Sequence, residues 1–187
     1  KLPAEIKDYE TAKKTFYRSL DLLGVEYVDL YLIHAPWPWN EIGKDCRKGN
    51  VEVYKLLEEV YKAGKAKAIG VSNFSPDDLK NIIENCEIVP MVNQIGYFIG
   101  LDQKATIDYC RDRDIFIIAY SPLGVGYLLS NPQIKEVANK YLVSSAQICL
   151  RYLIQKGVAA LPKSVHEDRI KQNTELDFEI DETDMAI

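Results

Sequence analysis

Residues 28–34 read Val-Asp-Leu-Tyr-Leu-Ile-His, a nearly continuous apolar run that ends in a histidine. Runs of this kind are typical of strands that are buried on both faces in a parallel sheet. Similar short runs recur along the chain, and stretches with the apolar spacing of helices separate them. We therefore predict five strands, over residues 28–34, 66–71, 91–95, 115–120 and 157–161.

The segments between these strands carry start and stop signals of helices. Ser75-Pro76-Asp77-Asp78 combines an N-cap, a proline at the first helical position and acidic residues at the positive end of the helix dipole. Ser144 and Gln147 have the spacing of a capping box. Asp8 is the predicted N-cap of a helix that Gly24 ends, with an apolar face of Ala12, Phe16, Leu20 and Leu23.

Strands that alternate with helices in this way predict an α/β fold with a parallel sheet. No Ser/Gly-rich linker or block of charge divides the chain, so we expect one domain over residues 1–187. Right-handed crossovers curl successive units in one direction, into either a barrel or a doubly wound sheet. No G-x-G-x-x-G motif follows any predicted strand, which favours the barrel.

The composition excludes several classes of protein. With 23 Lys+Arg against 28 Asp+Glu the formal charge is −5, which argues against nucleic acid as a main partner. No apolar run has the length of a membrane span, and no secretory leader is present, so we expect a cytoplasmic protein without a membrane partner. The spacing of the cysteines and histidines predicts neither a zinc site nor a disulfide framework.

Polar or reactive residues follow each predicted strand. In a parallel barrel the C-terminal ends of the strands converge on one mouth, where the functional sites of such folds lie. Five strand ends with this property predict a site built from His34, Ser72-Asn73, Asn93-Gln94, Tyr120-Ser121 and Lys163-Ser164.

Longer motifs surround these strand ends. They are Tyr27–His34, Gly70-Val71-Ser72-Asn73-Phe74, Val92-Asn93-Gln94, Ala119-Tyr120-Ser121-Pro122-Leu123-Gly124 and Pro162-Lys163-Ser164…Arg169-x-x-x-Asn173. In this order they span essentially the whole chain, and the set resembles the aldo-keto reductase family. The resemblance implies a (β/α)8 TIM barrel that reduces aldehydes and ketones with NADPH and without a metal. The chain then corresponds to the C-terminal two-thirds of that barrel, an incomplete barrel with about five strands.

The resemblance also implies two residues for catalysis and two for the substrate pocket. His34 resembles the family's catalytic histidine, and an imidazole N–H aimed at a developing alkoxide suits that role; the alternative is a core histidine bonded to backbone. Lys1 resembles the catalytic lysine that lowers the pKa of a tyrosine acid, and the alternative is a solvated lysine. Trp37 and Trp39 correspond to the wall of the substrate pocket, with core packing as the alternative.

Four positions match the nicotinamide end of the cofactor site. Ser72, Asn73 and Gln94 resemble the residues that bond the nicotinamide carboxamide and so orient the ring. Tyr120 resembles the residue that stacks on this ring. The alternatives are turn residues before the Ser75 cap, for the first two, and an ordinary core aromatic for Tyr120.

Six further positions match the phosphate and adenine end. Ser121 and Leu123 resemble residues that contact the pyrophosphate. The residues that resemble the family's site for the adenosine 2′-phosphate and adenine are Lys163, Ser164, Arg169 and Asn173. A lysine and an arginine on one phosphate make charge-assisted bonds, which favours NADPH over NADH. The alternative is that Ser164 caps a last helix over residues 166–174, with both cations solvated.

The chain also departs from the family pattern. Gly96 stands where the family commonly has Glu, Phe98-Ile99 replaces a His-Pro-like pair, and Ala35 replaces a bulky residue. None of the 12 tyrosines lies in the context of the family's proton donor. A (β/α)8 barrel typically needs about 250 residues. We therefore expect the 187 residues to be an inactive piece of a longer protein, without its N-terminal part and C-terminal tail.

The leading hypothesis is a cytoplasmic NADPH-dependent oxidoreductase that reduces aldehyde or ketone carbonyls to alcohols. Its partner is a small-molecule carbonyl substrate, and a monomer is the family default. The alternative is a non-catalytic aldo-keto-reductase-like module that binds the cofactor or a protein partner. A phosphate-sugar enzyme on an unrelated barrel fits less well, because the sequence lacks a Gly-rich phosphate loop and paired carboxylates.

Overall fold

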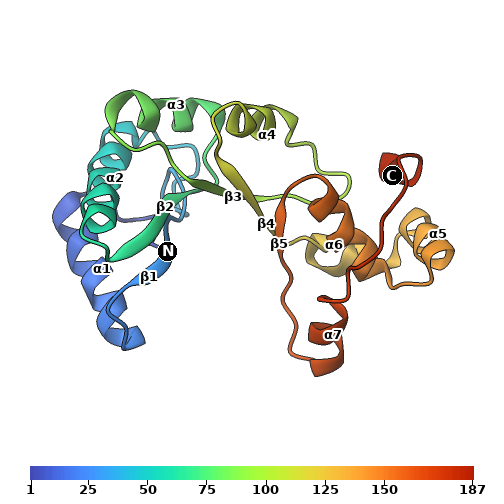
Figure 1. Ribbon diagram of the computed structural model, residues 1–187. Helices are drawn as coiled ribbons and strands as arrows, with labels where there is room; N and C mark the ends of the chain where they lie inside the picture. The colour runs from blue at the N-terminus through green and yellow to red at the C-terminus, as the bar shows by residue number, and fades with distance from the viewer. The chain divides into compact units, whose positions relative to one another are not determined.

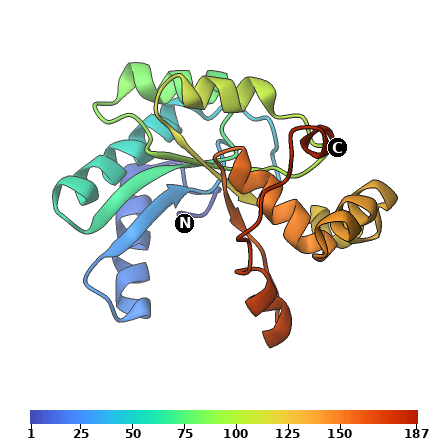
Figure 2. The same ribbon diagram turned by 45° about the vertical axis from the view of Figure 1, so that its right-hand side comes forward.

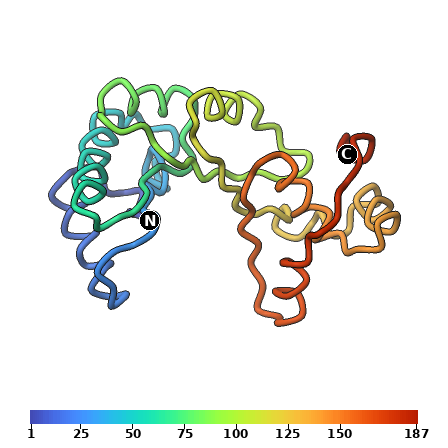
Figure 3. The backbone as a smooth tube through the Cα atoms, viewed as in Figure 1, coloured from blue at the N-terminus to red at the C-terminus, as the bar shows by residue number.

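The computed structural model describes residues 1–187, and its strands and helices alternate as predicted (Figure 1). The chain divides into two compact units. The first consists of Lys1–Gln94 and Ala105–Phe116, and the second of Ile95–Lys104 and Ile117–Ile187. The path of the chain through both units can be followed in the backbone tube of Figure 3.

The first unit is built on parallel strands β1 (Val28–Ile33), β2 (Ala66–Ser72) and β3 (Val92–Gly96), of which Ile95 and Gly96 belong to the second unit. β2 pairs with both neighbours, and the register sets Ile33 opposite Val71 and Ser72 opposite Gln94. On the other edge of β1, Leu2 makes an isolated parallel bridge to Ile33. The C-terminal ends of the three strands are therefore level with one another.

Four helices belong to this unit: α1 (Tyr9–Leu23), α2 (Arg47–Lys62), α3 (Pro76–Asn85) and α4 (Lys104–Arg111), of which Lys104 belongs to the second unit. The predicted caps are confirmed: the Asp8 side chain accepts a hydrogen bond from Thr11 N at 2.8 Å, and Ser75 forms a capping box with Asp78. α2 packs against β1, β2, α1 and α3, and Figure 2 shows α1 and α2 along the sheet. The apolar faces of these helices thus cover the strands.

Two burial predictions for this unit are wrong. Leu23 was expected on the buried face of α1 but is 64% exposed, because it lies in the last turn, beyond Leu20, the last buried residue of the helix. β1 was expected to be buried throughout, yet only Tyr31–Ile33 are buried. Its outer edge is covered only near Ile33, where Leu2 lies, so the first half of the strand stays partly exposed.

Gly70 marks a close approach between β2 and β3. A Cβ atom placed on Gly70 would lie 2.3 Å from the carbonyl oxygen of Val92 and 2.9 Å from its nitrogen. Both atoms are backbone and cannot yield, so Gly70→Ala is expected to lower the free energy of unfolding by about 1–3 kcal/mol, the usual cost of overpacking. Urea denaturation of the wild type and the variant measures this difference. An unchanged unfolding midpoint would contradict the close approach.

The second unit contains β4 (Phe116–Tyr120), whose first residue belongs to the first unit, and β5 (Ala159–Leu161). The two strands pair in parallel, with Tyr120 opposite Leu161. Its helices are α5 (Pro132–Tyr141), α6 (Ser145–Gln155) and α7 (Glu167–Gln172), with 3-10 segments η1 (Gly124–Ser130) and η2 (Asp184–Ala186). A core cluster joins η1, α5 and α6 with Ile99 and the segment around Ile180: Ile99, Leu128, Ile134, Val137, Ala138, Ile148, Cys149 and Ile180.

The predicted capping box at Ser144 and Gln147 is confirmed at the start of α6. The alternative interpretation, in which Ser164 caps the last helix, is wrong, because α7 begins only after His166. The Ser164 hydroxyl instead accepts a hydrogen bond from His166 N at 3.1 Å and so makes a local turn. All four cysteines are free, with Cys110 and Cys149 buried. No helix in the chain has the length and apolar character needed to cross a membrane.

Candidate active site and cofactor pocket

The predicted site residues fall into two groups, one in each unit. The first unit holds Lys1, His34, Trp37, Trp39, Ser72, Asn73 and Gln94, and the second holds Tyr120, Ser121, Leu123, Lys163, Ser164, Arg169 and Asn173.

His34 directly follows β1, and its backbone is fixed from one side. His34 N donates to the Leu2 carbonyl at 3.1 Å, and Leu2 N donates to the Leu32 carbonyl at 2.8 Å. The imidazole lies edge-on to Trp39, with 5.3 Å between the ring centroids. Neither ring nitrogen has a hydrogen-bond partner in the chain, so the ring is not the backbone-bonded core histidine of the alternative interpretation.

The charge state of His34 is set by its surroundings. Burial lowers the pKa of His34 below its ordinary value, and the positive charge of Lys1 lowers it further. Burial also lowers the pKa of Lys1, whose ammonium donates a hydrogen bond to Gln94 Oε1. A neutral imidazole keeps one N–H donor and one acceptor nitrogen. At neutral pH His34 can therefore donate a hydrogen bond without carrying a full charge.

Trp37 and Trp39 form an aromatic pair in the loop after His34. Their ring centroids are 5.2 Å apart at an interplanar angle of 77°. Trp39 is 43% exposed and Trp37 is half-buried. Pro36, before Trp37, and Pro38, between the two tryptophans, are buried. The indoles thus stand at the surface beside His34, and neither belongs to the buried core.

Ser72 and Asn73 tie the ends of the three strands together. The Ser72 hydroxyl donates to the Gln94 carbonyl at 2.8 Å. The Asn73 amide donates to the His34 carbonyl at 3.1 Å and to Ser72 Oγ at 3.2 Å. Asn73 has a φ of 61°, a left-handed conformation that asparagine tolerates better than most residues. These bonds link His34 to Gln94 through the loop after β2.

Asn93 is a residue of this site to which the sequence assigned no specific role. It is fully buried, its amide donates to the Phe74 carbonyl at 2.9 Å, and its Oδ1 atom has no partner. Asn93 therefore holds the backbone that follows Asn73. A polar residue inside an otherwise apolar buried strand was the available signal.

Tyr120 ends β4, and its ring lies against Gly96. A Cβ atom on Gly96 would lie 3.2 Å from both Cζ and Oη of Tyr120. Tyr120 is 37% exposed, so it is not the core aromatic of the alternative interpretation. The departure at Gly96 thus has a structural consequence, because the missing side chain leaves room for the phenol.

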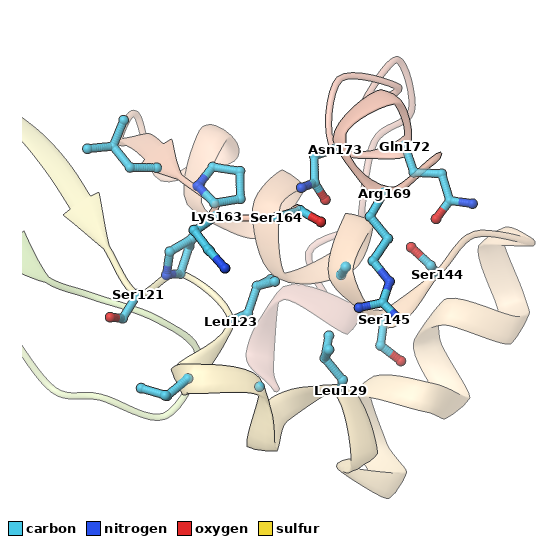
Figure 4. Close-up of a pocket in the computed structure, with 16 residues that line it drawn as sticks. Ser121, Leu123, Leu129, Ser144, Ser145, Lys163, Ser164, Arg169, Gln172 and Asn173 are labelled. Atoms are coloured by element: carbon cyan, nitrogen blue, oxygen red, sulfur yellow. The ribbon is translucent and has the colours of Figure 1, made fainter. Parts of the chain in front are cut away.

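The remaining predicted residues of the second unit share one pocket of about 680 Å³ (Figure 4). Its walls are the segment from Ser121 into η1, the start of α6, and the segment from Leu161 through α7. The predicted residues among its lining are Ser121, Leu123, Lys163, Ser164, Arg169 and Asn173. Ser144, Ser145 and Gln172 also line it and were not predicted, although the capping box had marked the start of α6.

Two cations characterise this pocket. Lys163 and Arg169 are exposed, and neither makes an ion pair or hydrogen bond within the chain. Figure 4 shows the Lys163 side chain on the Ser121 side of Leu123 and the Arg169 guanidinium beside Ser145. Unpaired lysine and arginine groups on one cavity bind a phosphate through charge-assisted hydrogen bonds. The pocket therefore fits an anionic, phosphate-bearing ligand.

Known proteins are similar to this chain in sequence and in fold. The sequence model of the protein family described as "Aldo/keto reductase family" matches residues 4–187 of this chain. Glyoxal reductase of Bacillus subtilis (strain 168) is 43% identical over 182 residues, which are 97% of this chain and 63% of that protein. The crystal structure of an aldo/keto reductase from Brucella melitensis aligns with a TM-score of 0.87 at 37% identity, covering 96% of this chain and 66% of that one.

A silkworm (Bombyx mori) aldo-keto reductase crystallised with NADPH aligns with a TM-score of 0.87 at 32% identity, covering 98% of this chain and 60% of that one. This chain thus spans less than two thirds of the length of each relative. The fold expected from the sequence, five parallel strands of a (β/α)8 barrel, is confirmed. Since the match runs from residue 4 to residue 187 through every strand end, the chain belongs to the aldo-keto reductase family.

Proposed function

We propose that the full-length protein is an NADPH-dependent oxidoreductase that reduces aldehyde or ketone carbonyls to alcohols. The observation that carries this proposal is the pocket of the second unit, where Lys163 and Arg169 have no partner in the chain. Family membership supports the reaction class. A relative named for the reduction of glyoxal and a structural neighbour complexed with NADPH are consistent with it.

The residues present suit the parts of this cofactor. In the proposal, Lys163, Ser164 and Arg169 hold the 2′-phosphate, and Asn173 contacts the adenine. Ser121 and Leu123 contact the pyrophosphate. Ser72, Asn73 and Gln94 orient the nicotinamide amide, and Tyr120 stacks on the ring. When bound, NADPH supplies the hydride that the carbonyl carbon accepts.

At the carbonyl oxygen, His34 is proposed to act as hydrogen-bond donor. Its ring nitrogens are free of partners, and the lowered pKa of His34 keeps the ring neutral at pH 7. A donor aimed at the oxygen stabilises the charge that develops there in the transition state. Lys1 adds a positive charge near the same oxygen while Gln94 holds its ammonium. Trp37 and Trp39 shield this end of the site from water.

The proposal also covers the setting of the reaction. Residues 1–187 are proposed to belong to a single barrel domain, supported by a family match that continues across both units. The protein is proposed to be a cytoplasmic monomer that acts on a small molecule and not on nucleic acid. The formal charge of −5 supports the last point.

The test is a turnover assay on the full-length protein with glyoxal and a simple aldehyde. We expect carbonyl-dependent oxidation of NADPH, with one alcohol formed for each NADPH consumed. NADPH binding without turnover on any carbonyl would favour the non-catalytic module instead. The 187 residues alone are expected to show no turnover, because five strands do not close an eight-stranded barrel.

A further inference from the structure

Lys7 lies between the start of the chain and α1 and reaches into the loop after β1. Its ammonium donates hydrogen bonds to the Ala35 carbonyl at 2.8 Å and to Asn50 Oδ1 at 2.9 Å. The residue is half-buried, unlike most lysines of the chain. Its charge is therefore directed at the backbone that follows His34 and away from solvent.

Asn50, in α2, completes this contact. Its side chain is almost fully buried, with the residue 2% exposed, and its amide nitrogen donates to the Pro36 carbonyl at 2.9 Å. Both polar atoms of the Asn50 side chain are thus engaged, one by Lys7 and one by Pro36. The two side chains thus donate hydrogen bonds to two consecutive carbonyl groups, those of Ala35 and Pro36.

The loop needs such external partners because of its sequence. Pro36 and Pro38 have no backbone N–H, so these residues cannot be held through donors. The carbonyls of His34, Ala35 and Pro36 instead each accept a hydrogen bond from a different side chain, those of Asn73, Lys7 and Asn50. Three successive carbonyls immediately before Trp37 are fixed in this way.

Gly49 makes this arrangement sterically possible. A Cβ atom on Gly49 would lie 2.6 Å from the Lys7 carbonyl oxygen and 2.7 Å from Lys7 Cβ. Only glycine lets the first turn of α2 pass this close to Lys7, which brings Asn50 within reach of the ammonium. The contact therefore depends on matched residues at three positions.

Burial of the Lys7 ammonium has an energetic cost. Burial lowers the pKa of Lys7 from 10.5 to about 8, although Cys46, Glu5 and Asp78 nearby oppose this change. A site that served stability alone would gain little from a charge that is partly removed from water. A role in holding the loop explains why a lysine stands here.

We propose that Lys7 and Asn50 are positioning residues for the substrate-binding loop, which they hold so that Trp37 and Trp39 stand beside His34. The inference rests on the proposed function, because it takes this loop as the wall of the carbonyl pocket. Lys7 and Asn50 thereby determine how well a carbonyl substrate fits, although neither touches it.

The test uses full-length protein labelled with fluorotryptophan and observed by fluorine NMR. Trp37→Phe and Trp39→Phe assign the two resonances of the loop. Lys7→Met removes the hydrogen bonds to the Ala35 carbonyl and to Asn50, and Asn50→Asp removes the hydrogen bond to the Pro36 carbonyl. The aspartate also sets a carboxylate oxygen against the Pro36 carbonyl. Lys13→Met is the matched control, because Lys13 pairs with Glu59 at the surface of α1 and α2.

Lys7→Met and Asn50→Asp are expected to shift or split both resonances, whereas Lys13→Met leaves them unchanged. KM for an aldehyde should rise about tenfold, with kcat changed less than about threefold and the Kd for NADPH within about twofold, since only substrate placement is affected. Unchanged resonances and unchanged KM in both variants would overturn the proposal.

A pH titration of the wild-type protein decides the matter even if Lys7→Met does not fold. Both resonances should titrate with a midpoint near 8, because deprotonation of Lys7 removes the charge from its two hydrogen bonds. Cys46→Ser, which removes the nearby thiol, should leave this titration in place. Resonances that stay constant through this range would overturn the proposal.

The outcomes separate this inference from the proposed function. Perturbed tryptophan resonances in a protein that reduces no carbonyl would leave the positioning role standing and reject the reductase activity. Normal carbonyl reduction, with tryptophan resonances and KM unchanged in the Lys7 and Asn50 variants, would support the reductase activity and reject the positioning role.

Discussion

His34→Ala in the full-length protein is expected to lower kcat/KM for aldehydes at least about a hundredfold, because loss of one hydrogen-bond donor at a developing oxyanion typically costs about 10²–10³-fold. The imidazole is held at the end of β1 through its backbone, and no group of the chain occupies its nitrogens. Alanine keeps the backbone hydrogen bond to the Leu2 carbonyl and removes only the imidazole donor. The loss should therefore appear in turnover, with the fold intact.

Two measurements make this prediction specific to the carbonyl oxygen. The Kd for NADPH should stay nearly constant in His34→Ala, because the proposed phosphate contacts lie in the other unit. His166→Ala is the matched control, since the chain has only two histidines and His166 is exposed and makes no side-chain cap for α7. Equal losses in the two variants, or a loss of NADPH affinity in His34→Ala, would contradict the role of His34.

Local sequence patterns predicted most of the fold because the interactions behind them join residues that are close in the sequence. The Asp8, Ser75 and Ser144 caps need only a side chain and a backbone N–H a few residues away. The failures involve contacts with distant residues. The first half of β1 is partly exposed because Leu2 pairs with the strand only at Ile33. The apolar periodicity of the strand contains no information on that contact.

The 3-10 segment η1 shows another limit of local patterns. Val125 within it has a φ of 55°, a left-handed conformation that is strained for a β-branched residue. No local signal predicts a valine there. Its neighbours Gly124 and Gly126 also have positive φ values, so three successive residues of this turn share the left-handed sign of φ.

The grouping of the candidate residues was predictable where the rule of strand ends applied and not where it depended on contacts between residues far apart in the sequence. His34, Asn73 and Gln94 could be placed together because parallel strands align their C-terminal ends. The pairing of Lys7 with Asn50 joins residues 43 positions apart and follows no motif. The consequence of Gly96 likewise became visible only with the Tyr120 ring beside it.

Lys163→Ala and Arg169→Ala are each expected to weaken NADPH binding by about 1.5–3 kcal/mol, the usual worth of a hydrogen bond to a charged group. This corresponds to roughly a 10- to 150-fold rise in Kd. NADH binding should hardly change, because NADH lacks the 2′-phosphate that the two cations are proposed to hold. Since neither cation has a partner in the chain, its removal breaks no internal contact that would confuse the comparison.

Fluorescence titration of the full-length protein with both cofactors measures this difference. Lys171→Ala is the matched control. Lys171 is, like Arg169, an exposed cation of α7, but it faces Glu175 at 4.0 Å and does not line the pocket. It should leave both Kd values unchanged, which separates a specific phosphate contact from a general loss of positive charge. If the Lys163 or Arg169 variants lost NADPH and NADH affinity equally, these side chains would lie away from the 2′-phosphate, because only a contact to that group distinguishes the two cofactors.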